Sequence, residues 1–178
     1  MSRQNKSKEE QASEKIFVDS HTRTDSGRFV VALPFSGPEP TFIDTHNIAL
    51  RRFLSLERRL RLDPILYDGY WAFMKDYFDS GHMSLASSCR ESDGSSYYIA
   101  YHAVQRPEST TTALRVVFDC SMKDALAESL NDCILVGPKF QRDILPILLR
   151  FRLHAIVFTA DIRQMYRQIS ITPFHRRL

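Results

Sequence analysis

Residues 97–104, Tyr-Tyr-Ile-Ala-Tyr-His-Ala-Val, and residues 113–119, Ala-Leu-Arg-Val-Val-Phe-Asp, are two short runs rich in aromatic and β-branched side chains. Such side chains are enriched in strands, and the intervening Pro-Glu-Ser-Thr-Thr-Thr is typical of a turn. The two runs therefore predict an antiparallel hairpin with its tip at residues 106–112. His102, the lone histidine of the first run, is more typical of a structural residue than of a metal ligand or a base.

A further apolar run, Ala-Ile-Val-Phe-Thr-Ala at residues 155–160, directly precedes Asp161. Its composition predicts a strand buried on both faces, and the ends of such strands often carry chemistry. A carboxylate in that place suits hard divalent cations such as Mg²⁺. The alternative is that Asp161 caps a helix beginning near Arg163, because Asp is a favoured N-cap residue. The preceding residues 140–152 predict a helix, which tolerates Pro146 only if it starts just before that proline.

Two helices are predicted upstream of the hairpin. Residues 47–62 carry apolar side chains at helical spacing with the arginines mostly off that face, which indicates a basic amphipathic helix. The apolar residues of this helix are Leu50, Phe53, Leu54 and Leu60. Asp63 as N-cap and Pro64 in the first turn begin a second helix, which runs to about Ser80 and is closed by Gly81. Its apolar stripe predicts packing in a core rather than a surface for base stacking. The stripe comprises Leu66, Tyr70, Phe73, Met74 and Tyr77.

The flanking segments carry weaker patterns. Residues 1–27 are rich in Ser, Lys, Glu and Gln and poor in apolar residues, which predicts disorder. Residues 28–34, Arg-Phe-Val-Val-Ala-Leu-Pro, predict a short strand that a cluster of Pro and Gly residues ends. Residues 84–96 are mostly small and polar and predict a loop.

Charge is informative mainly through its distribution. The 178 residues include 24 Lys or Arg and 21 Asp or Glu, and the net charge of +3 is by itself weak evidence for any partner. Two clusters of arginine suit the phosphate backbone of nucleic acids. A solvated helix face, with Glu57 partly offsetting the charge, is an alternative of equal weight. The clusters comprise Arg51, Arg52, Arg58, Arg59 and Arg61, and Arg150, Arg152, Arg163, Arg167, Arg176 and Arg177.

The cysteines and the hydropathy of the sequence indicate the cellular compartment in which the protein is expected. Cys89, Cys120 and Cys133 lack any Cys-x-x-Cys spacing, and their odd number argues against a disulfide framework. They indicate reduced thiols and an intracellular location, cytoplasmic or nuclear. No run of about 18 apolar residues occurs, and the N-terminus is polar rather than a signal sequence. The sequence therefore predicts no membrane partner.

Four colinear segments extend these local patterns. They are Tyr-His-Ala-Val-Gln-Arg-Pro-Glu-Ser-Thr-Thr-Thr-Ala-Leu-Arg-Val-Val-Phe-Asp-Cys-Ser from residue 101, Ser-Leu-Asn-Asp-Cys-Ile-Leu-Val-Gly-Pro-Lys from residue 129, Leu-Leu-Arg-Phe-Arg-Leu-His from residue 148 and Phe-Thr-Ala-Asp-Ile from residue 158. In this order the chain resembles, over residues 98–173, the reverse transcriptase of BEL/Pao long-terminal-repeat retrotransposons. The resemblance implies an α+β fold, a partial right-hand polymerase with fingers, the N-terminal half of the palm and a helical lead-in segment. The implied ranges are a disordered N-terminus (1–27), a connector with a strand and two amphipathic helices (28–96), and fingers with a partial palm (97–178).

The resemblance also assigns roles to individual residues. Asp161 matches the first catalytic Asp of the palm, with the backbone carbonyl of Ile162 as a further Mg²⁺ ligand. Tyr166 matches the aromatic residue that lies under the incoming sugar and excludes a 2′-hydroxyl. Gln164 lies in the turn whose backbone amides face the triphosphate. Arg115 matches the fingers arginine that contacts the α-phosphate of the nucleotide.

Further roles and their alternatives complete this assignment. Asn131 matches a template-side residue and Asp119 a structural one. The clustering of charge, rather than the resemblance, assigns four arginines of the first cluster to nucleic-acid binding: Arg51, Arg52, Arg58 and Arg59. From the residues alone, Tyr166 is equally an ordinary core aromatic and Arg115 a charge on an edge strand. Gln164, Asp119 and Asn131 favour structural over catalytic roles.

The implied activity is RNA-directed DNA polymerisation, a nucleotidyl transfer with Mg²⁺ as cofactor and with an RNA or DNA template–primer and deoxynucleotides as partners. The family's aromatic-x-Asp-Asp element does not occur in these residues, and no acidic residue follows Asp161. We therefore expect these residues to be inactive alone and to need downstream palm and thumb segments of a polyprotein. Two alternatives remain: a non-catalytic nucleic-acid-binding remnant of a decayed or co-opted element, and a truncated product that does not fold stably because its sheet is incomplete.

Overall fold

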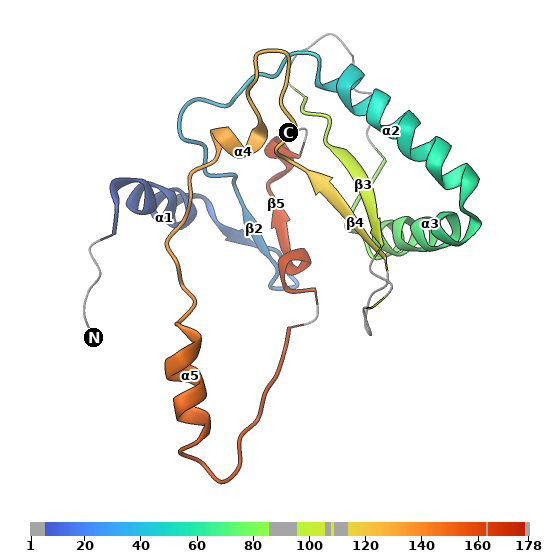
Figure 1. The fold of residues 1–178 in the computed structure, drawn as a ribbon. Helices are drawn as coiled ribbons and strands as arrows, with labels where there is room; N and C mark the ends of the chain where they lie inside the picture. The colour runs from blue at the N-terminus through green and yellow to red at the C-terminus, as the bar shows by residue number, and fades with distance from the viewer. Residues whose placement is uncertain (1–5, 86–95, 106–107, 109–113, 163, 177–178) are drawn as a thin grey trace. The chain divides into compact units, whose positions relative to one another are not determined.

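The chain has an α+β fold, as the sequence predicts (Figure 1). The computed structural model describes residues 6–85, 96–105, 108, 114–162 and 164–176. Two compact units each combine separate stretches of the chain: unit 1 contains Met1–Pro34 and Leu135–Pro173, and unit 2 contains Phe35–Ile134 and Phe174–Leu178. The ranges 1–27, 28–96 and 97–178 rest on resemblance rather than on compactness, and they remain a prediction.

The predicted hairpin forms the centre of unit 2. Strands β3 (Ala100–Gln105) and β4 (Leu114–Asp119) pair antiparallel, with a register that runs from Ala100 opposite Asp119 to Gln105 opposite Leu114. The hairpin is confirmed, although β3 begins three positions later than the predicted start at residue 97. Most of the predicted tip, residues 106–112, lies outside the described residues.

Helices α2 (Thr45–Leu62) and α3 (Pro64–Asp79) pack on one face of this hairpin (Figure 1). The core between them is apolar, and its burial supplies the main favourable free energy of the unit. Its buried residues are Leu56, Leu60, Leu66, Tyr70, Ala103 and Val116, with Phe73, Met74, Tyr101 and Leu114 packed against them. The predicted stripe of α3 therefore lies in a core, and Tyr77 joins it through a ring contact with Phe118 at 5.6 Å.

The buried face of α2 differs from the predicted one. Leu56 and Leu60 are buried, whereas Leu50, Phe53 and Leu54 are between 37% and 42% exposed. The spacing of apolar residues allows either face, and packing against β3 selects the one that presents Leu56 and Leu60 to Ala103. The predicted helix is confirmed and Leu60 lies on its buried face, whereas the predicted apolar residues Leu50, Phe53 and Leu54 are exposed.

The ends of α3 follow the sequence signals closely. The side chain of Asp63 accepts a hydrogen bond from the N–H of Leu66 at 2.9 Å, and Pro64 occupies the first helical position. Gly81 has φ +68°, a left-handed conformation that glycine adopts without strain. Both the predicted N-cap and the predicted stop at Gly81 are confirmed.

Asp124 anchors the segment before α2 to the loop after β4. Its buried carboxylate accepts three backbone N–H groups, from Ile43 at 3.0 Å, Leu126 at 2.8 Å and Glu128 at 3.0 Å. Burial by itself would raise the pKa of Asp124, but these three donors outweigh it and hold the pKa below its usual value. The Asp124 carboxylate thereby ties Ile43, two positions before α2, to the loop that follows β4.

The short helix α4 (Leu130–Cys133) begins at a reciprocal cap. The Ser129 hydroxyl donates to Asp132 at 2.7 Å, the Asp132 N–H returns a bond to that hydroxyl oxygen at 3.3 Å, and Lys123 donates to the same carboxylate at 2.5 Å. These donors, Lys123 first and Ser129 second, lower the pKa of Asp132 from 3.8 to about 2.

Asp132→Asn is expected to destabilise the chain at neutral pH by an amount that shrinks in acid. A carboxylate with a lowered pKa in the folded state stabilises that state above pH 3.8 and ceases to do so as the pH falls toward 2. Urea unfolding of wild type and variant at stepwise lower pH measures the difference. A difference that stays constant down to the lowest pH would contradict this origin.

Unit 1 contains a small mixed sheet in the order β1-β2-β5. Strand β1 (Thr22–Arg23) pairs antiparallel with β2 (Phe29–Val31), and β2 pairs parallel with β5 (Ile169–Ile171). Arg28 donates to the carbonyls of Arg167 and Gln168, which joins the two distant stretches of the unit. The strand predicted within residues 28–34 is therefore confirmed as β2.

The prediction of disorder for residues 1–27 is wrong over α1 (Lys8–Ser20). A capping box begins this helix: the Ser7 hydroxyl accepts from the N–H of Glu10, and the Glu10 carboxylate accepts from the N–H of Ser7. Phe17 then packs on Phe29 of β2, with ring centroids 6.4 Å apart. The polar composition of this segment led to the prediction of disorder, although the capping box of Ser7 and Glu10 is present in the sequence.

The predicted helix at residues 140–152 is present as α5 (Ile144–Phe151), with Pro146 in its first turn as required. The predicted buried strand at residues 155–160 is wrong. These residues form no strand and are exposed, Phe158 by 90%. An apolar β-rich run becomes a strand only beside another strand that pairs its backbone groups, and no described strand pairs with this one.

Candidate nucleic-acid interface

One face of the β3–β4 hairpin lies opposite the apolar core of unit 2, and α2 reaches this face through the pair of Arg52 with Asp119. Successive strand residues point to opposite faces, and Tyr101 and Ala103 pack toward the helices. The opposite side, here called the outer face, therefore carries Ala100, His102, Val104, Arg115, Val117 and Asp119, of which Ala100 is buried. Val117 is 40% exposed. This face is a two-stranded surface with one arginine and one histidine available to a ligand.

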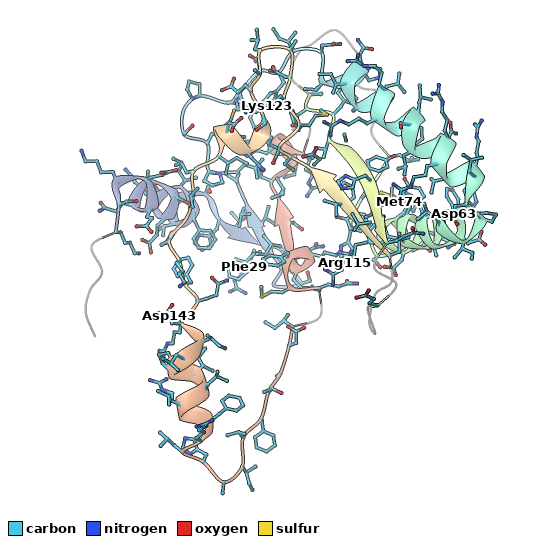
Figure 2. All side chains as sticks on the ribbon, in the orientation of Figure 1. Phe29, Asp63, Met74, Arg115, Lys123 and Asp143 are labelled. Atoms are coloured by element: carbon cyan, nitrogen blue, oxygen red, sulfur yellow. The ribbon has the colours of Figure 1, made fainter. Side chains whose placement is uncertain are left out.

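Arg115 occupies the middle of this outer face. It is exposed and lies opposite Val104, while His102 lies opposite Val117 (Figure 2 labels Arg115). Arg115 and His102 are thus diagonal neighbours, a relation that places Cα atoms roughly 7–8 Å apart in such sheets. A guanidinium group so placed can make two parallel hydrogen bonds to one phosphate. The predicted contact of Arg115 with a nucleotide α-phosphate remains a prediction.

The four arginines of α2 assigned to nucleic-acid binding do not share one surface. Arg52 pairs with Asp119 at 2.6 Å, and Arg59 donates to the carbonyl of Ala103 at 2.9 Å. Arg51 contacts the carbonyl of Asn47 within its own helix at 3.4 Å, and Arg58 is exposed. Arg52 and Arg59 therefore reach the hairpin, while Arg51 and Arg58 are rotated away from it.

A depression of about 280 Å³ lies between α2 and β3. It is lined from α2 by Arg52, Ser55, Leu56 and Arg59 and from β3 by residues 100–102. The four helix residues follow the spacing i, i+3, i+4, i+7, which places them on one helix face. No acidic side chain is among its described lining residues, although Asp119 pairs with the lining Arg52 and partly offsets the charge of the two arginines.

Asn131 has a structural environment. Its side-chain amide donates to the Ser121 hydroxyl at 2.8 Å, and its backbone N–H donates to the carbonyl of Cys120 at 3.1 Å. These bonds close the turn that follows β4. Asp119 likewise accepts from the N–H of Ser121 at 3.1 Å, in addition to its pair with Arg52. The template-side role of Asn131 is still a prediction, but the bonds favour the structural alternative.

The residues assigned to catalysis and nucleotide binding in unit 1 lie in an irregular exposed segment. Asp161 and Ile162 are exposed, and Tyr166 is 79% exposed within the 3₁₀ helix η1 (Met165–Gln168), which rules out a core aromatic there. Gln164 precedes η1 with φ +52°. The helix expected from Arg163 is absent, since η1 is a single turn with Gln164 as its N-cap.

The donor set around Asp161 is too small for a two-metal site. Asp161 offers one carboxylate, and the carbonyl of Ile162 already accepts the N–H of Met165 at 3.2 Å. Among the described residues, no three His, Cys, Asp or Glu side chains gather where they could hold an ion. Two Mg²⁺ ions require several oxygen ligands, so these residues alone do not fit the metal centre.

Sequence reasoning missed Ser55 in the depression, and it treated His102 as structural. A signal for the depression was available, because Arg52, Ser55 and Arg59 lie on one helix face. The sequence did not indicate that β3 lies beside this face of α2.

The comparisons with known proteins add no identity: no family model, curated protein or solved structure matches this chain. None of the helices in the described part of the chain is long and apolar enough to cross a bilayer. The functional argument therefore depends on the side chains themselves.

Proposed function

We propose that this chain forms the fingers and the first part of the palm of an RNA-directed DNA polymerase of the retrotransposon type. The role of the described residues is to bind nucleic acid and nucleotide phosphates. The observation that carries the proposal is the β3–β4 hairpin, which α2 and α3 support on one face while Arg115 is exposed on the other. The packed helices hold one face of the hairpin in place, and Arg115 offers a positive charge to a phosphate on the other face.

In this proposal the reaction is nucleotidyl transfer. A primer 3′-hydroxyl attacks the α-phosphate of a deoxynucleotide, and Arg115 binds the oxygens of that phosphate. Asp161 and the carbonyl of Ile162 would hold only part of a metal site, whose further carboxylates would come from outside these residues, and Mg²⁺ bound there would supply charge neutralisation. Tyr166 restricts the sugar, and the turn at Gln164 faces the triphosphate. The partners are template–primer, deoxynucleotides and the downstream palm and thumb segments.

A second candidate is nucleic-acid binding without catalysis, by a remnant of a decayed or co-opted element. It is favoured by the exposed, irregular setting of Asp161 and by the small donor set around it. The two candidates share the hairpin and differ in whether primer extension accompanies binding.

Arg115→Gln is expected to weaken binding of a labelled template–primer and to reduce the slope of log affinity against log salt by about 1. Each phosphate contact releases counterions, so the loss of one contact lowers the slope. Fluorescence anisotropy at several salt concentrations measures both quantities. Arg142→Gln is the matched control, because Arg142 is exposed and lies outside the hairpin.

Two results would count against binding at the outer face. One is wild-type protein that binds no oligonucleotide at low salt. The other is an Arg115→Gln variant whose affinity and slope equal those of Arg142→Gln.

A further inference from the structure

We infer that the depression between α2 and β3 is a second binding site, which holds one phosphodiester group of a single nucleic-acid strand between Arg52 and Arg59. The inference rests on the proposed function, since it assumes that the chain binds nucleic acid. It goes further by naming a site that the family resemblance does not assign and the chemical group that the site binds.

The positions of the two arginines define the site. Residues seven apart in a helix are separated along its axis by roughly 10 Å, and both Arg52 and Arg59 line the depression. Ser55 lies between them on the same helix face and His102 faces them from β3. The walls therefore offer guanidinium, hydroxyl and imidazole groups, all of which hydrogen-bond to phosphate oxygens.

The arginines on the wall of the depression and the apolar residues on its floor both favour binding of an anion. Leu56 and Ala100 are 5% and 3% exposed, so the floor is apolar and strengthens hydrogen bonds made above it. Arg59 uses one of its five N–H donors on the carbonyl of Ala103 and keeps the others for a ligand. The side chain of Arg52 is 50% exposed beside Asp119.

The setting of the depression favours a strand over free phosphate. His102 belongs both to the depression and to the outer face that carries Arg115. A strand that leaves the depression past His102 therefore meets Arg115 next. A free phosphate ion would use only the first of these two surfaces.

Asp119 competes with the ligand for Arg52. Its carboxylate occupies the Arg52 guanidinium at 2.6 Å, as a phosphate would. Asp119→Asn removes this competing charge and keeps the oxygen that accepts the Ser121 N–H. Exposed ion pairs contribute up to about 1 kcal/mol, so oligonucleotide binding should tighten by about two- to fivefold.

The test compares two double variants of the full chain. Arg52→Gln with Arg59→Gln removes the pair that lines the depression. Arg51→Gln with Arg58→Gln removes two charges at the same spacing from the same helix, outside it. Binding of a short labelled single-stranded RNA should fall about tenfold or more in the first variant, and its salt slope should drop by about 0.7, the value for one phosphate contact on a single strand, with a clearly smaller effect in the second.

The outcomes separate this inference from the proposed function. Equal losses in the two double variants overturn the depression as a site and leave the proposed function intact. Wild-type protein that binds no oligonucleotide overturns both. Displacement of the RNA by submillimolar inorganic phosphate overturns the assignment to a strand.

Folding is controlled separately, because Arg59 also bonds to the backbone of β3. Arg59→Lys keeps the charge and a donor, and it should retain most of the salt slope even if the double variant unfolds. If Asp119→Asn weakens RNA binding while its circular dichroism stays unchanged, the competition between Asp119 and phosphate is refuted.

Discussion

Primer extension should fall by at least about three orders of magnitude when Asp161 is replaced by Asn in the polypeptide encoded by the complete transcript. In the proposed polymerase Asp161 would be one of the carboxylates that hold Mg²⁺, whose chemistry would be to neutralise charge on the transferred phosphate. Asn keeps the size of the side chain and removes that charge. Extension of a labelled primer on an RNA template, at saturating deoxynucleotide, measures the rate.

The control is Asp143→Asn in the same polypeptide. Asp143 is also an exposed carboxylate of unit 1, but it pairs with Lys139 at 2.8 Å, so its loss should leave extension unchanged. Extension at the wild-type rate by the Asp161 variant would remove this residue from catalysis. If the wild-type polypeptide extends no primer, the polymerase proposal fails and binding without catalysis is the function that remains.

Asp124→Ala is expected to destabilise the chain by about 3–4 kcal/mol. The change leaves the N–H groups of Ile43, Leu126 and Glu128 without their acceptor in a buried site. It also releases the segment that leads into α2. Urea unfolding followed by circular dichroism measures the loss, and limited proteolysis should show new cleavage near residues 42–45.

Two companion variants define the cause. Asp124→Asn keeps one acceptor oxygen and should lose clearly less stability than Asp124→Ala. Asp68→Ala removes an exposed carboxylate from α3 and should change stability by no more than about 0.5 kcal/mol. A loss at Asp124 no larger than that at Asp68 would show that the three hydrogen bonds contribute little.

The parts of the fold that sequence reasoning predicts are those with local signals. The hairpin follows from two β-rich runs around a turn, and α3 follows from an N-cap, a first-turn proline and a closing glycine. The capping box at Ser7 and Glu10 shows that α1 was predictable too, had local pattern been weighed above composition. Local chemistry is sufficient for these elements.

Elements that depend on distant partners are harder to predict. The run at residues 155–160 has strand composition, yet a strand needs a neighbour, which composition does not supply. The buried face of α2 depends on β3, more than 35 positions further along the chain. Asp124 receives a hydrogen bond from Ile43, 81 positions away. The depression beside β3 could not be predicted from sequence patterns either, because its two walls come from segments that are distant in the sequence.

The bond from Arg59 to the Ala103 carbonyl also limits how this sheet can grow. With α2 running beside β3 and Arg59 occupying a backbone acceptor there, an incoming strand would first have to displace a helix (Figure 1). On the side of β4 away from β3, no strand pairs among the described residues. Any segment that enlarges this sheet, from this polypeptide or from a partner, is therefore directed to join next to β4.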